Sequence, residues 1–370
     1  MASSSQQFGF ELFDNNNGVP DAAFTNASSS FGVNASWEPD LWGRISDQIS
    51  SSELDAQAAQ ADFAGARLAV TSQVTQTWFN LIEARLLFEL AERDVETQER
   101  ALRLTQRRFE SGVAGSSDVR LARSSVASSE ALKISRQQQV AALSRNLEVL
   151  LRRYPADAIE AADDLPVLPS LTGAGLPADM LTRRPDLLAA ERRLSGQGLS
   201  VDLARKALYP RISLDAGINT SGNSLTRIFD LDSMIASLAA NLTQPIFNGG
   251  SLKANVKQQE AFLKREAEAY AGLVLDAYLE VENALDAEQR LAERETALRT
   301  SLEEALMAEQ RLERRYAEGL ASILQLLDAQ SRRISAESQL ISARTERLNN
   351  RVRLHVALGG GIYGDTSVAP

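Results

Sequence analysis

The sequence contains no cysteine and only one histidine among its 370 residues. The absence of cysteine excludes disulfides, thiolate metal sites and a cysteine nucleophile. The chain also has no run of 18 apolar residues, so it predicts no transmembrane helix. No phosphate-binding glycine loop, zincin motif or nucleophile elbow is present. The sequence therefore predicts neither an enzyme nor a bound cofactor or metal.

Aromatic residues and proline are also scarce, at 6% of the chain and 10 residues respectively. Alanine, leucine, arginine, glutamate, glutamine and serine dominate instead, which is a composition typical of long helices. The formal net charge is −10. Such a charge argues against a nucleic-acid partner, because binding nucleic acid requires a basic surface.

One short turn occurs twice in the chain, at residues 107–114 and 314–321. Each copy has two arginines and an aromatic residue, followed three positions later by Gly112 or Gly319. Glycine tolerates the left-handed conformation that ends a helix, so each copy predicts a turn between two antiparallel helices. Gly319 follows Gly112 by 207 residues, which indicates an internal duplication.

Long helical patterns precede and follow both turns. We expect long helices at 43–109 and 250–316, return arms at 118–153 and 323–357, and a separate helix at 186–208. Apolar residues recur every seven positions in the long helices, which predicts left-handed coiled coils. A long helix of about 100 Å exceeds its return arm of about 54 Å. The helix at 186–208 could stack on a return arm and cover the remainder.

The two copies are expected to differ by one heptad in the long helix. Trp78 precedes Phe109 by 31 residues, whereas Tyr278, taken as its counterpart, precedes Tyr316 by 38 residues. An insertion of seven residues keeps the apolar seam in phase.

Four short segments, at 7–13, 31–37, 212–218 and 234–243, alternate between apolar and polar residues. This alternation predicts strands with one apolar and one polar face. We expect the apolar face to contact lipid. Its predicted lipid-facing residues are Phe8, Phe10, Phe31, Val33, Trp37, Ile212, Leu214, Ile218, Leu238 and Leu242.

Four strands are too few to close a barrel, and an open sheet would leave its edges exposed. Twelve strands from three chains make a plausible closed barrel, and an apolar exterior places that barrel in a bilayer. The predicted fold is therefore mainly α with membrane β-barrel strands. Each chain would contribute two repeats of two strands and a long helical hairpin to a trimer.

The repeats suggest a division of the chain. The first repeat covers 1–153, with strands at 7–38 and a hairpin at 43–153, and a linker or equatorial segment follows at 154–183. The second repeat covers 184–358, with strands at 211–243 and a hairpin at 250–357, and 359–370 forms a tail. No helix equivalent to 186–208 precedes residue 7. We therefore expect the chain to be truncated at its N-terminus by at least one helix and to assemble weakly.

Several motifs together resemble the outer-membrane efflux protein family, that is, the TolC/OprM-like channel-tunnels, in the branch of NodT-type lipoproteins. The resemblance covers essentially the whole chain. It is carried by Arg184-Pro185-Asp186, Ala204-Arg205, Tyr209-Pro210-Arg211-Ile212-Ser213-Leu214, Pro245-Ile246-Phe247-Asn248-Gly249-Gly250, Arg315-Tyr316-Ala317-Glu318-Gly319, Leu327-Asp328-Ala329-Gln330 and Ala357-Leu358-Gly359-Gly360-Gly361.

The resemblance implies a homotrimer with a twelve-stranded outer-membrane barrel and a helical tunnel in the periplasm. It implies the exit duct of a tripartite efflux system, which passively exports small molecules. An inner-membrane pump of the RND type would drive export through a periplasmic membrane-fusion adaptor. The family docks that adaptor at the two turns, which here contain Gly112, Val113, Ala114, Gly319, Leu320 and Ala321.

The resemblance also implies a periplasmic gate at Leu324 and Asp328. A basic partner often found in this constriction would fall at Ser331, with Arg332 one position later, so the salt bridge of the gate departs from the family pattern. Three Asp328 carboxylates in a narrow trimeric pore would form a ring that selects cations. Without the resemblance, Asp328 is better interpreted as a solvated charge.

Other interpretations remain open from the sequence alone. The arginine pairs before the turns fit helix ends, where cations complement the helix dipole, and they also fit contact with an acidic adaptor. Trp42 fits a membrane interface or packing at the junction of strand and helix. The chain as a whole also fits a soluble coiled-coil scaffold or a truncated, non-functional efflux channel.

Overall fold

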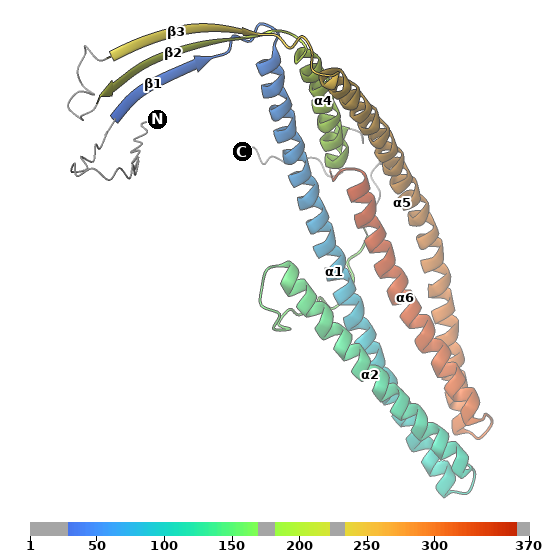
Figure 1. Cartoon of the computed structure of the whole chain (residues 1–370). Helices are drawn as coiled ribbons and strands as arrows, with labels where there is room; N and C mark the ends of the chain where they lie inside the picture. Colours follow the sequence, from blue (N-terminus) through green and yellow to red (C-terminus); the bar gives the residue numbers. More distant parts are fainter. Residues whose placement is uncertain (1–28, 169–181, 223–233, 361–370) are drawn as a thin grey trace, which may run out of the picture. The chain divides into compact units, whose positions relative to one another are not determined.

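The computed structural model describes residues 29–168, 182–222 and 234–360. Figure 1 shows its helices and strands. The chain forms two units, one containing residues 1–56 and 192–268 and the other containing residues 57–191 and 269–370. Each unit contains parts of both sequence repeats, because the boundary passes through three helices. The elements in chain order are β1 (Ser29–Trp37), α1 (Arg44–Glu110), α2 (Ser116–Leu150), α4 (Pro185–Lys206), β2 (Arg211–Gly222), β3 (Met234–Thr243), α5 (Ser251–Ala317) and α6 (Ile323–Ala357).

The first unit contains an antiparallel sheet in the order β1-β2-β3. Val33 lies opposite Ile218, and Ile212 lies opposite Leu242. Because side chains alternate along a strand, this register places the predicted apolar residues on one face of the sheet. The residues on this shared face are Val33, Trp37, Ile212, Leu214, Ile218, Leu238 and Leu242.

Three of the residues that we expected on this face cannot be placed on it. Phe8 and Phe10 lie outside the described residues, as does the side chain of Phe31. On the opposite face, Asp215 accepts hydrogen bonds from Ser36 Oγ at 2.6 Å and from Asn241 Nδ2 at 2.8 Å. The sheet therefore has one apolar face and one polar face, as the alternation predicted.

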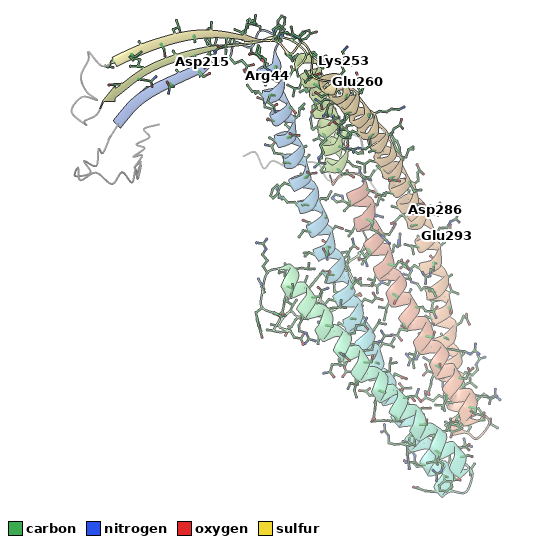
Figure 2. All side chains as sticks on the ribbon, in the orientation of Figure 1. Arg44, Asp215, Lys253, Glu260, Asp286 and Glu293 are labelled. Atoms are coloured by element: carbon green, nitrogen blue, oxygen red, sulfur yellow. The ribbon has the colours of Figure 1, made fainter. Side chains whose placement is uncertain are left out.

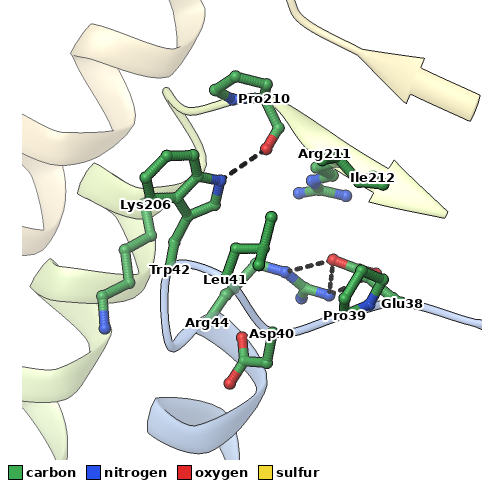
Figure 3. Close-up of a pocket in the computed structure, with 10 residues that line it drawn as sticks. All are labelled: Glu38, Pro39, Asp40, Leu41, Trp42, Arg44, Lys206, Pro210, Arg211 and Ile212. Atoms are coloured by element: carbon green, nitrogen blue, oxygen red, sulfur yellow. Dashed lines mark hydrogen bonds and ion pairs between the residues drawn. The ribbon is translucent and has the colours of Figure 1, made fainter.

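Trp42 lies where the strands meet the helices of the first unit (Figure 3). Its indole Nε1 donates to the carbonyl oxygen of Pro210 at 2.8 Å, and its ring packs 5.3 Å from that of Tyr209. Trp42 is therefore a packing residue of this junction, the second of the two interpretations that the sequence left open. Lys206 of α4 also forms an ion pair with Asp47 of α1.

The carboxylate of Asp40 caps the start of α1. It accepts hydrogen bonds from the backbone N–H groups of Ile45 at 2.9 Å and Ser46 at 2.8 Å. Desolvation raises the pKa of Asp40, but the hydrogen bonds from Ile45 and Ser46 outweigh it and lower the pKa to about 2. The carboxylate thus satisfies N–H groups that have no partner inside the helix.

The two helical hairpins have equal lengths. We call α1 and α2 hairpin 1, and α5 and α6 hairpin 2. Each long helix has 67 residues and each return arm has 35. The first and last residues of α1 and α2 precede those of α5 and α6 by 207 residues, which is also the separation of the two glycine turns. We call this separation the offset. Among the described residues, none of the helices contains an apolar stretch long enough to span a membrane.

The expected extra heptad in the second long helix was therefore wrong. We matched Trp78 to Tyr278 because both are aromatic, but the offset places Leu285 opposite Trp78. Both residues are partly buried and pack against core clusters of the second unit. An apolar heptad position accepts aromatic and aliphatic side chains alike, so residue type did not fix the register.

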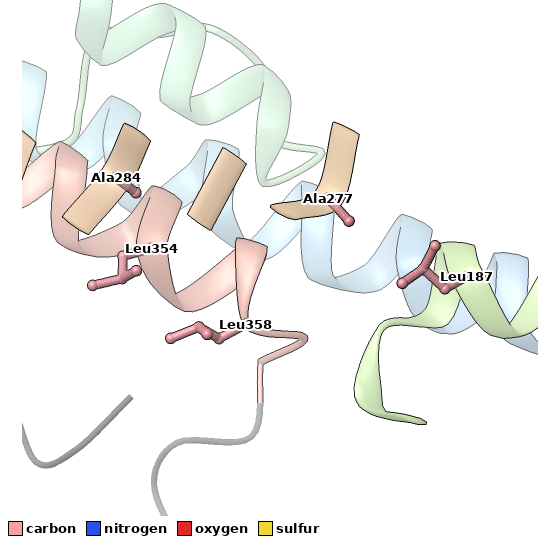
Figure 4. Packing of buried hydrophobic residues seen from close by; sticks show 5 residues of the cluster. All are labelled: Leu187, Ala277, Ala284, Leu354 and Leu358. Atoms are coloured by element: carbon pink, nitrogen blue, oxygen red, sulfur yellow. The ribbon is translucent and has the colours of Figure 1, made fainter. Parts of the chain in front are cut away.

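The start of α4 packs against the end of α6 (Figure 4). Leu187 is fully buried with Leu354 and Leu358 against two alanines of α5, Ala277 and Ala284. The turn after α6 allows this approach, since a Cβ on Gly359 would lie 2.9 Å from the carbonyl oxygen of Arg183. The 22-residue helix α4 thus starts where the 35-residue return arm α6 ends, as the helix lengths predicted.

Residues 157–168 cross from α1 to α6 within the second unit. We call this segment the strap. Asp163 pairs with Arg85 of α1 at 2.7 Å, and Asp164 pairs with Arg344 of α6 at 3.2 Å. Leu165 is buried between Ile82 of α1 and Leu348 of α6. The strap therefore joins the two hairpins through one ion pair on each side and a shared apolar contact.

Candidate functional site at the hairpin tips

Each hairpin ends in a turn that we call a tip, with tip 1 at residues 111–115 and tip 2 at residues 318–322. Gly112 has φ 76° and Gly319 has φ 83°. In tip 1, the Gly112 N–H donates to Phe109 O at 2.9 Å and the Val113 N–H donates to Arg108 O at 2.8 Å. Tip 2 repeats this pattern one offset later. It is the Schellman motif, in which a left-handed glycine ends the helix.

The residue after each glycine is apolar and exposed. Val113 is 65% exposed and Leu320 is 64% exposed. In tip 2 the helix that follows starts with a reciprocal cap between Ser322 and Gln325. In tip 1 the carboxylate of Asp118 accepts a hydrogen bond from the Gly115 N–H at 3.2 Å, and Gly115 has no side chain to reciprocate. Each tip is therefore a rigid turn that presents one aliphatic side chain.

The tips differ in their aromatic residue. Tyr316, before tip 2, is 2% exposed and packs with Ala101, Ile323 and Leu326. Its hydroxyl lies 2.8 Å from Thr105 Oγ1 of α1, which in turn donates to Ala101 O at 2.7 Å. Because the single hydroxyl proton of Thr105 is donated to Ala101 O, the Tyr316 hydroxyl is the donor in the hydrogen bond between Tyr316 and Thr105.

Arg108 strengthens this contact between the hairpins. Its guanidinium lies 4.5 Å from the centre of the Tyr316 ring, and Nη1 donates to the Tyr316 carbonyl oxygen. The cation thus packs on the negative face of the ring. We expected the arginine pairs to lie in solvent at the helix ends or on an adaptor, and for Arg108 the solvent interpretation was wrong. A single-chain pattern carries no signal for this contact, because its partner lies 208 residues away.

The predicted gate residues lie one turn apart on α6. Leu324 is 64% exposed, and Asp328 pairs with Arg332 at 2.8 Å. Both side chains of this ion pair are exposed, so the pair contributes little to stability. The basic partner of Asp328 in the protomer is therefore Arg332 on the same helix, one position after Ser331.

Buried charges join the helices above the tips. Arg333 of α6 pairs with Glu309 of α5 at 2.6 Å and with Glu337 at 2.9 Å. Glu337 also pairs with Arg93 of α1 at 2.6 Å. Burial raises the pKa of Glu309 above its usual value, although attraction to Arg333 opposes the shift. This network could not be predicted from the sequence, because each residue alone resembles a solvated helix charge.

Comparison with known proteins identifies the family. The model of the outer membrane efflux protein family matches residues 7–151 and 176–360. This chain belongs to the outer membrane efflux protein family. The residues between the two matched ranges include the whole strap.

Relatives in this family match most of the length of the chain. The chain is 32% identical over 351 residues to the probable efflux pump outer membrane protein TtgC of Pseudomonas putida, covering 92% of this chain and 71% of TtgC. The solved structure of the outer-membrane channel OprN matches with a TM-score of 0.83 and 28% identity, covering 94% of this chain and 79% of OprN. The open outer membrane channel MtrE of Neisseria gonorrhoeae matches with a TM-score of 0.82 and 28% identity, covering 95% of this chain and 80% of MtrE.

These matches confirm the predicted fold class and location. The chain has the fold of a TolC-like channel-tunnel protomer and is an outer-membrane efflux protein. The soluble scaffold is therefore excluded.

Proposed function

We propose that this protein is the outer-membrane exit duct of a tripartite efflux system. Three chains would contribute their strands to one barrel in the outer membrane, and their hairpins would form a tunnel in the periplasm. The duct itself would perform no chemistry. An inner-membrane pump of the RND type would supply the energy for export of small molecules. The duplicated hairpin with two equivalent tips is the observation that carries this proposal.

The tips are the proposed docking site for a periplasmic adaptor. Both present a glycine with positive φ, an exposed aliphatic residue and an alanine, in the same backbone geometry. Three chains would therefore offer six similar sites to adaptor hairpins. Rigid turns suit this role because little conformational entropy is lost when a partner docks.

Leu324 and Asp328 are the proposed gate. Both point from one side of α6 and are exposed in the protomer. In a trimer their side chains would form one apolar ring and one acidic ring, and the acidic ring would favour cations. The contact between Tyr316 and Thr105 would hold the two hairpins of a chain together beside this gate.

An export assay tests the proposal. The protein would be expressed with a matching adaptor and pump in cells that lack their own outer-membrane duct, and ethidium efflux would be measured. We expect the wild-type chain to restore efflux. Gly112→Ala combined with Gly319→Ala should abolish this rescue, since alanine disfavours positive φ.

Gly272→Ala provides the matched control. Gly272 lies within α5, and a Cβ there would meet nothing within 4 Å, as is also true of Gly112. The same substitution is thus compared with and without the positive φ. Wild-type protein that reaches the membrane but gives no efflux would contradict the proposed function. Full efflux in the double tip variant would contradict docking at the tips.

A further inference from the structure

The strap and hairpin 2 enclose a cleft, which we call the strap cleft. It has a volume of about 740 Å³ and is lined by residues of the strap, α5 and α6. All of these residues belong to the second unit. A volume of about 300–1,000 Å³ is usual for sites that bind small molecules. The family model does not match residues 152–175, so the strap side of the cleft lies outside the matched family pattern.

The charged side chains of the strap cleft come from α5 and α6, and most of them are arginines. They are Glu288, Glu295, Arg299, Arg344, Arg347 and Arg351. Arg344 also pairs with Asp164 of the strap at 3.2 Å. Four guanidinium groups thus face three carboxylates, which leaves one positive charge in excess.

Arginines already hold both glutamates of the cleft. Glu288, whose side chain is 8% exposed, pairs with Arg351 at 2.8 Å and with Arg347 at 3.4 Å. Glu295 pairs with Arg299 at 2.8 Å and with Arg347 at 3.0 Å. Arg347 uses its Nε and Nη1 in these contacts, and its Nη2 donates to no residue among those that the structure describes. Because a guanidinium has five N–H donors, Arg347 retains donors for a further anion.

The remaining wall of the strap cleft is apolar. Leu165, Val167 and Leu168 of the strap line it together with Leu285 of α5 and Leu340 of α6. Val167 is 94% exposed, whereas Leu165 is buried. An exposed aliphatic side chain beside a group of arginines suits a ligand that has both a charged head and an apolar tail.

Hairpin 1 does not repeat this charged set. One offset earlier, five of the six charged residues have uncharged counterparts, which are Leu81, Phe88, Gln137, Val140 and Ser144. The sixth, Arg299, corresponds to the acidic Glu92. A hairpin of the same length therefore forms without these arginines, so helix packing alone does not require them in hairpin 2.

An acidic surface of α5 lies outside the strap cleft. The side chains of Asp286 and Glu293 are 67% and 59% exposed, and they project from α5 on the side away from α6 (Figure 2). Neither residue lines the cleft. The strap cleft is thus a basic site in a chain whose formal net charge is −10.

We infer that the strap cleft binds an amphipathic monoanion, of the class of medium-chain carboxylates. Its carboxylate would accept hydrogen bonds from Arg347 and Arg344, since guanidinium groups bind carboxylates with paired donors. Its aliphatic chain would cover Val167 and Leu340 and remove them from water. The bound ligand would join the strap to hairpin 2. This site needs neither the adaptor nor the pump of the proposed function.

Protection of an introduced cysteine tests the site in protein held in lipid nanodiscs. The chain has no cysteine, so A292C places a single thiol in the strap cleft, where Ala292 is half-buried. We expect octanoate at about four times its Kd to slow labelling by N-ethylmaleimide about fivefold, because only the free site reacts. Octanamide has the same chain without the charge, and acetate has the charge without the chain. Neither should protect the thiol.

A287C provides the matched control. Ala287 is also a half-buried alanine of α5, but it lines a different groove. Octanoate should leave its labelling unchanged. Anionic and cationic methanethiosulfonates give a second readout, which needs no arginine variant. The ratio of anionic to cationic reaction rates should be higher at position 292 than at position 287.

Arg347→Gln removes the excess positive charge and should abolish protection of A292C by octanoate. Glu288 then keeps Arg351 and Glu295 keeps Arg299, so neither glutamate is left alone. Arg294→Gln is the control, because Arg294 pairs with Glu346 at 2.8 Å between the same two helices but does not line the cleft. This variant should retain full protection.

Several outcomes would overturn the inference. Equal protection by octanamide would show an apolar crevice that does not recognise an anion, and equal protection by acetate would show an anion site without an apolar wall. A292C that stays unreactive while A287C reacts would show that the cleft is closed in the assembled protein. Equal methanethiosulfonate ratios at the two positions would remove the basic character of the site. None of these measurements depends on efflux, so the proposed function is tested separately.

Discussion

The two hairpins share their length and their turn but differ in what they bury between their helices. In hairpin 2, Arg333 of α6 pairs with Glu309 of α5 at 2.6 Å, and both side chains are nearly buried. One offset earlier, hairpin 1 has Val126 and Leu102 at these positions. A buried ion pair and an aliphatic pair therefore occupy the same place in two equivalent coiled coils.

Hairpin 1 has a buried polar pair of its own. Ser129 of α2 donates to Asp94 of α1 at 2.6 Å, and both residues are buried. The counterparts in hairpin 2 are Ala336 and Ser301. The length and the glycine turn thus fix the shape of a hairpin, whereas buried polar groups make each hairpin distinct. Such groups can specify which helices pair, at some cost in stability.

The largest expected effect follows from breaking the ion pair of hairpin 2. Arg333→Val should destabilise the protein by about 3–5 kcal/mol, because Glu309 is left buried without a partner. The double variant Arg333→Val/Glu309→Leu copies hairpin 1 and should recover most of the loss. Thermal unfolding in detergent, followed by circular dichroism, measures both. A double variant as unstable as the single variant would show that the hairpins are not interchangeable at this position.

Removing the hydroxyl of Tyr316 makes the two tips alike. Tyr316→Phe loses one hydrogen bond, which costs about 1 kcal/mol, while Thr105 still donates to Ala101. The channel should therefore open more often, with an increase in open probability of roughly fivefold per contact. Tyr270→Phe in α5 is the control, because among the described residues the Tyr270 hydroxyl makes no hydrogen bond. Equal effects from the two variants would contradict the role of the Tyr316 hydroxyl.

The sequence predicted the shape of the hairpins far better than their contacts. A glycine after a long apolar repeat is a local signal. Both tips and the five helices α1, α2, α4, α5 and α6 of the described residues were therefore found to within a few residues of their observed bounds. The contact of Arg108 with Tyr316 has no local signal, because it depends on how two hairpins pack. The strap is similar, since Asp163 and Asp164 have the composition of an ordinary loop and find their arginines only in the folded chain. The first predicted strand lies outside the described residues.

Asp328 of the proposed gate has an apolar counterpart in hairpin 1. The equivalent residue in hairpin 1 is Leu121, which packs against the buried cluster that contains Tyr316 and Leu326. Asp328→Leu should lower the preference of the channel for cations and leave its stability within about 0.5 kcal/mol of wild type, because the ion pair with Arg332 is exposed. Reversal potentials in a salt gradient measure the preference. Unchanged selectivity would remove Asp328 from the proposed gate.

The smallest expected effect concerns the start of the long helices. Asp40 caps α1, whereas the matching position before α5 is Phe247. The pKa of Asp40 falls from 3.8 to about 2 on folding, so its charge stabilises the folded protein above pH 3.8. This contribution is lost as the pH falls toward 2. Asp40→Asn should therefore show a smaller loss of melting temperature between pH 4 and pH 2 than wild type. Parallel curves would show that the carboxylate charge does not matter at this cap.

The most direct test of the account is the mass of the detergent-extracted protein, measured by light scattering with the detergent contribution subtracted. The account predicts an assembly of three chains that requires detergent. Such a stable trimer would also overturn the weak assembly that we expected from the sequence. A detergent-independent dimer, or a monomer at all concentrations, would contradict the trimeric exit duct.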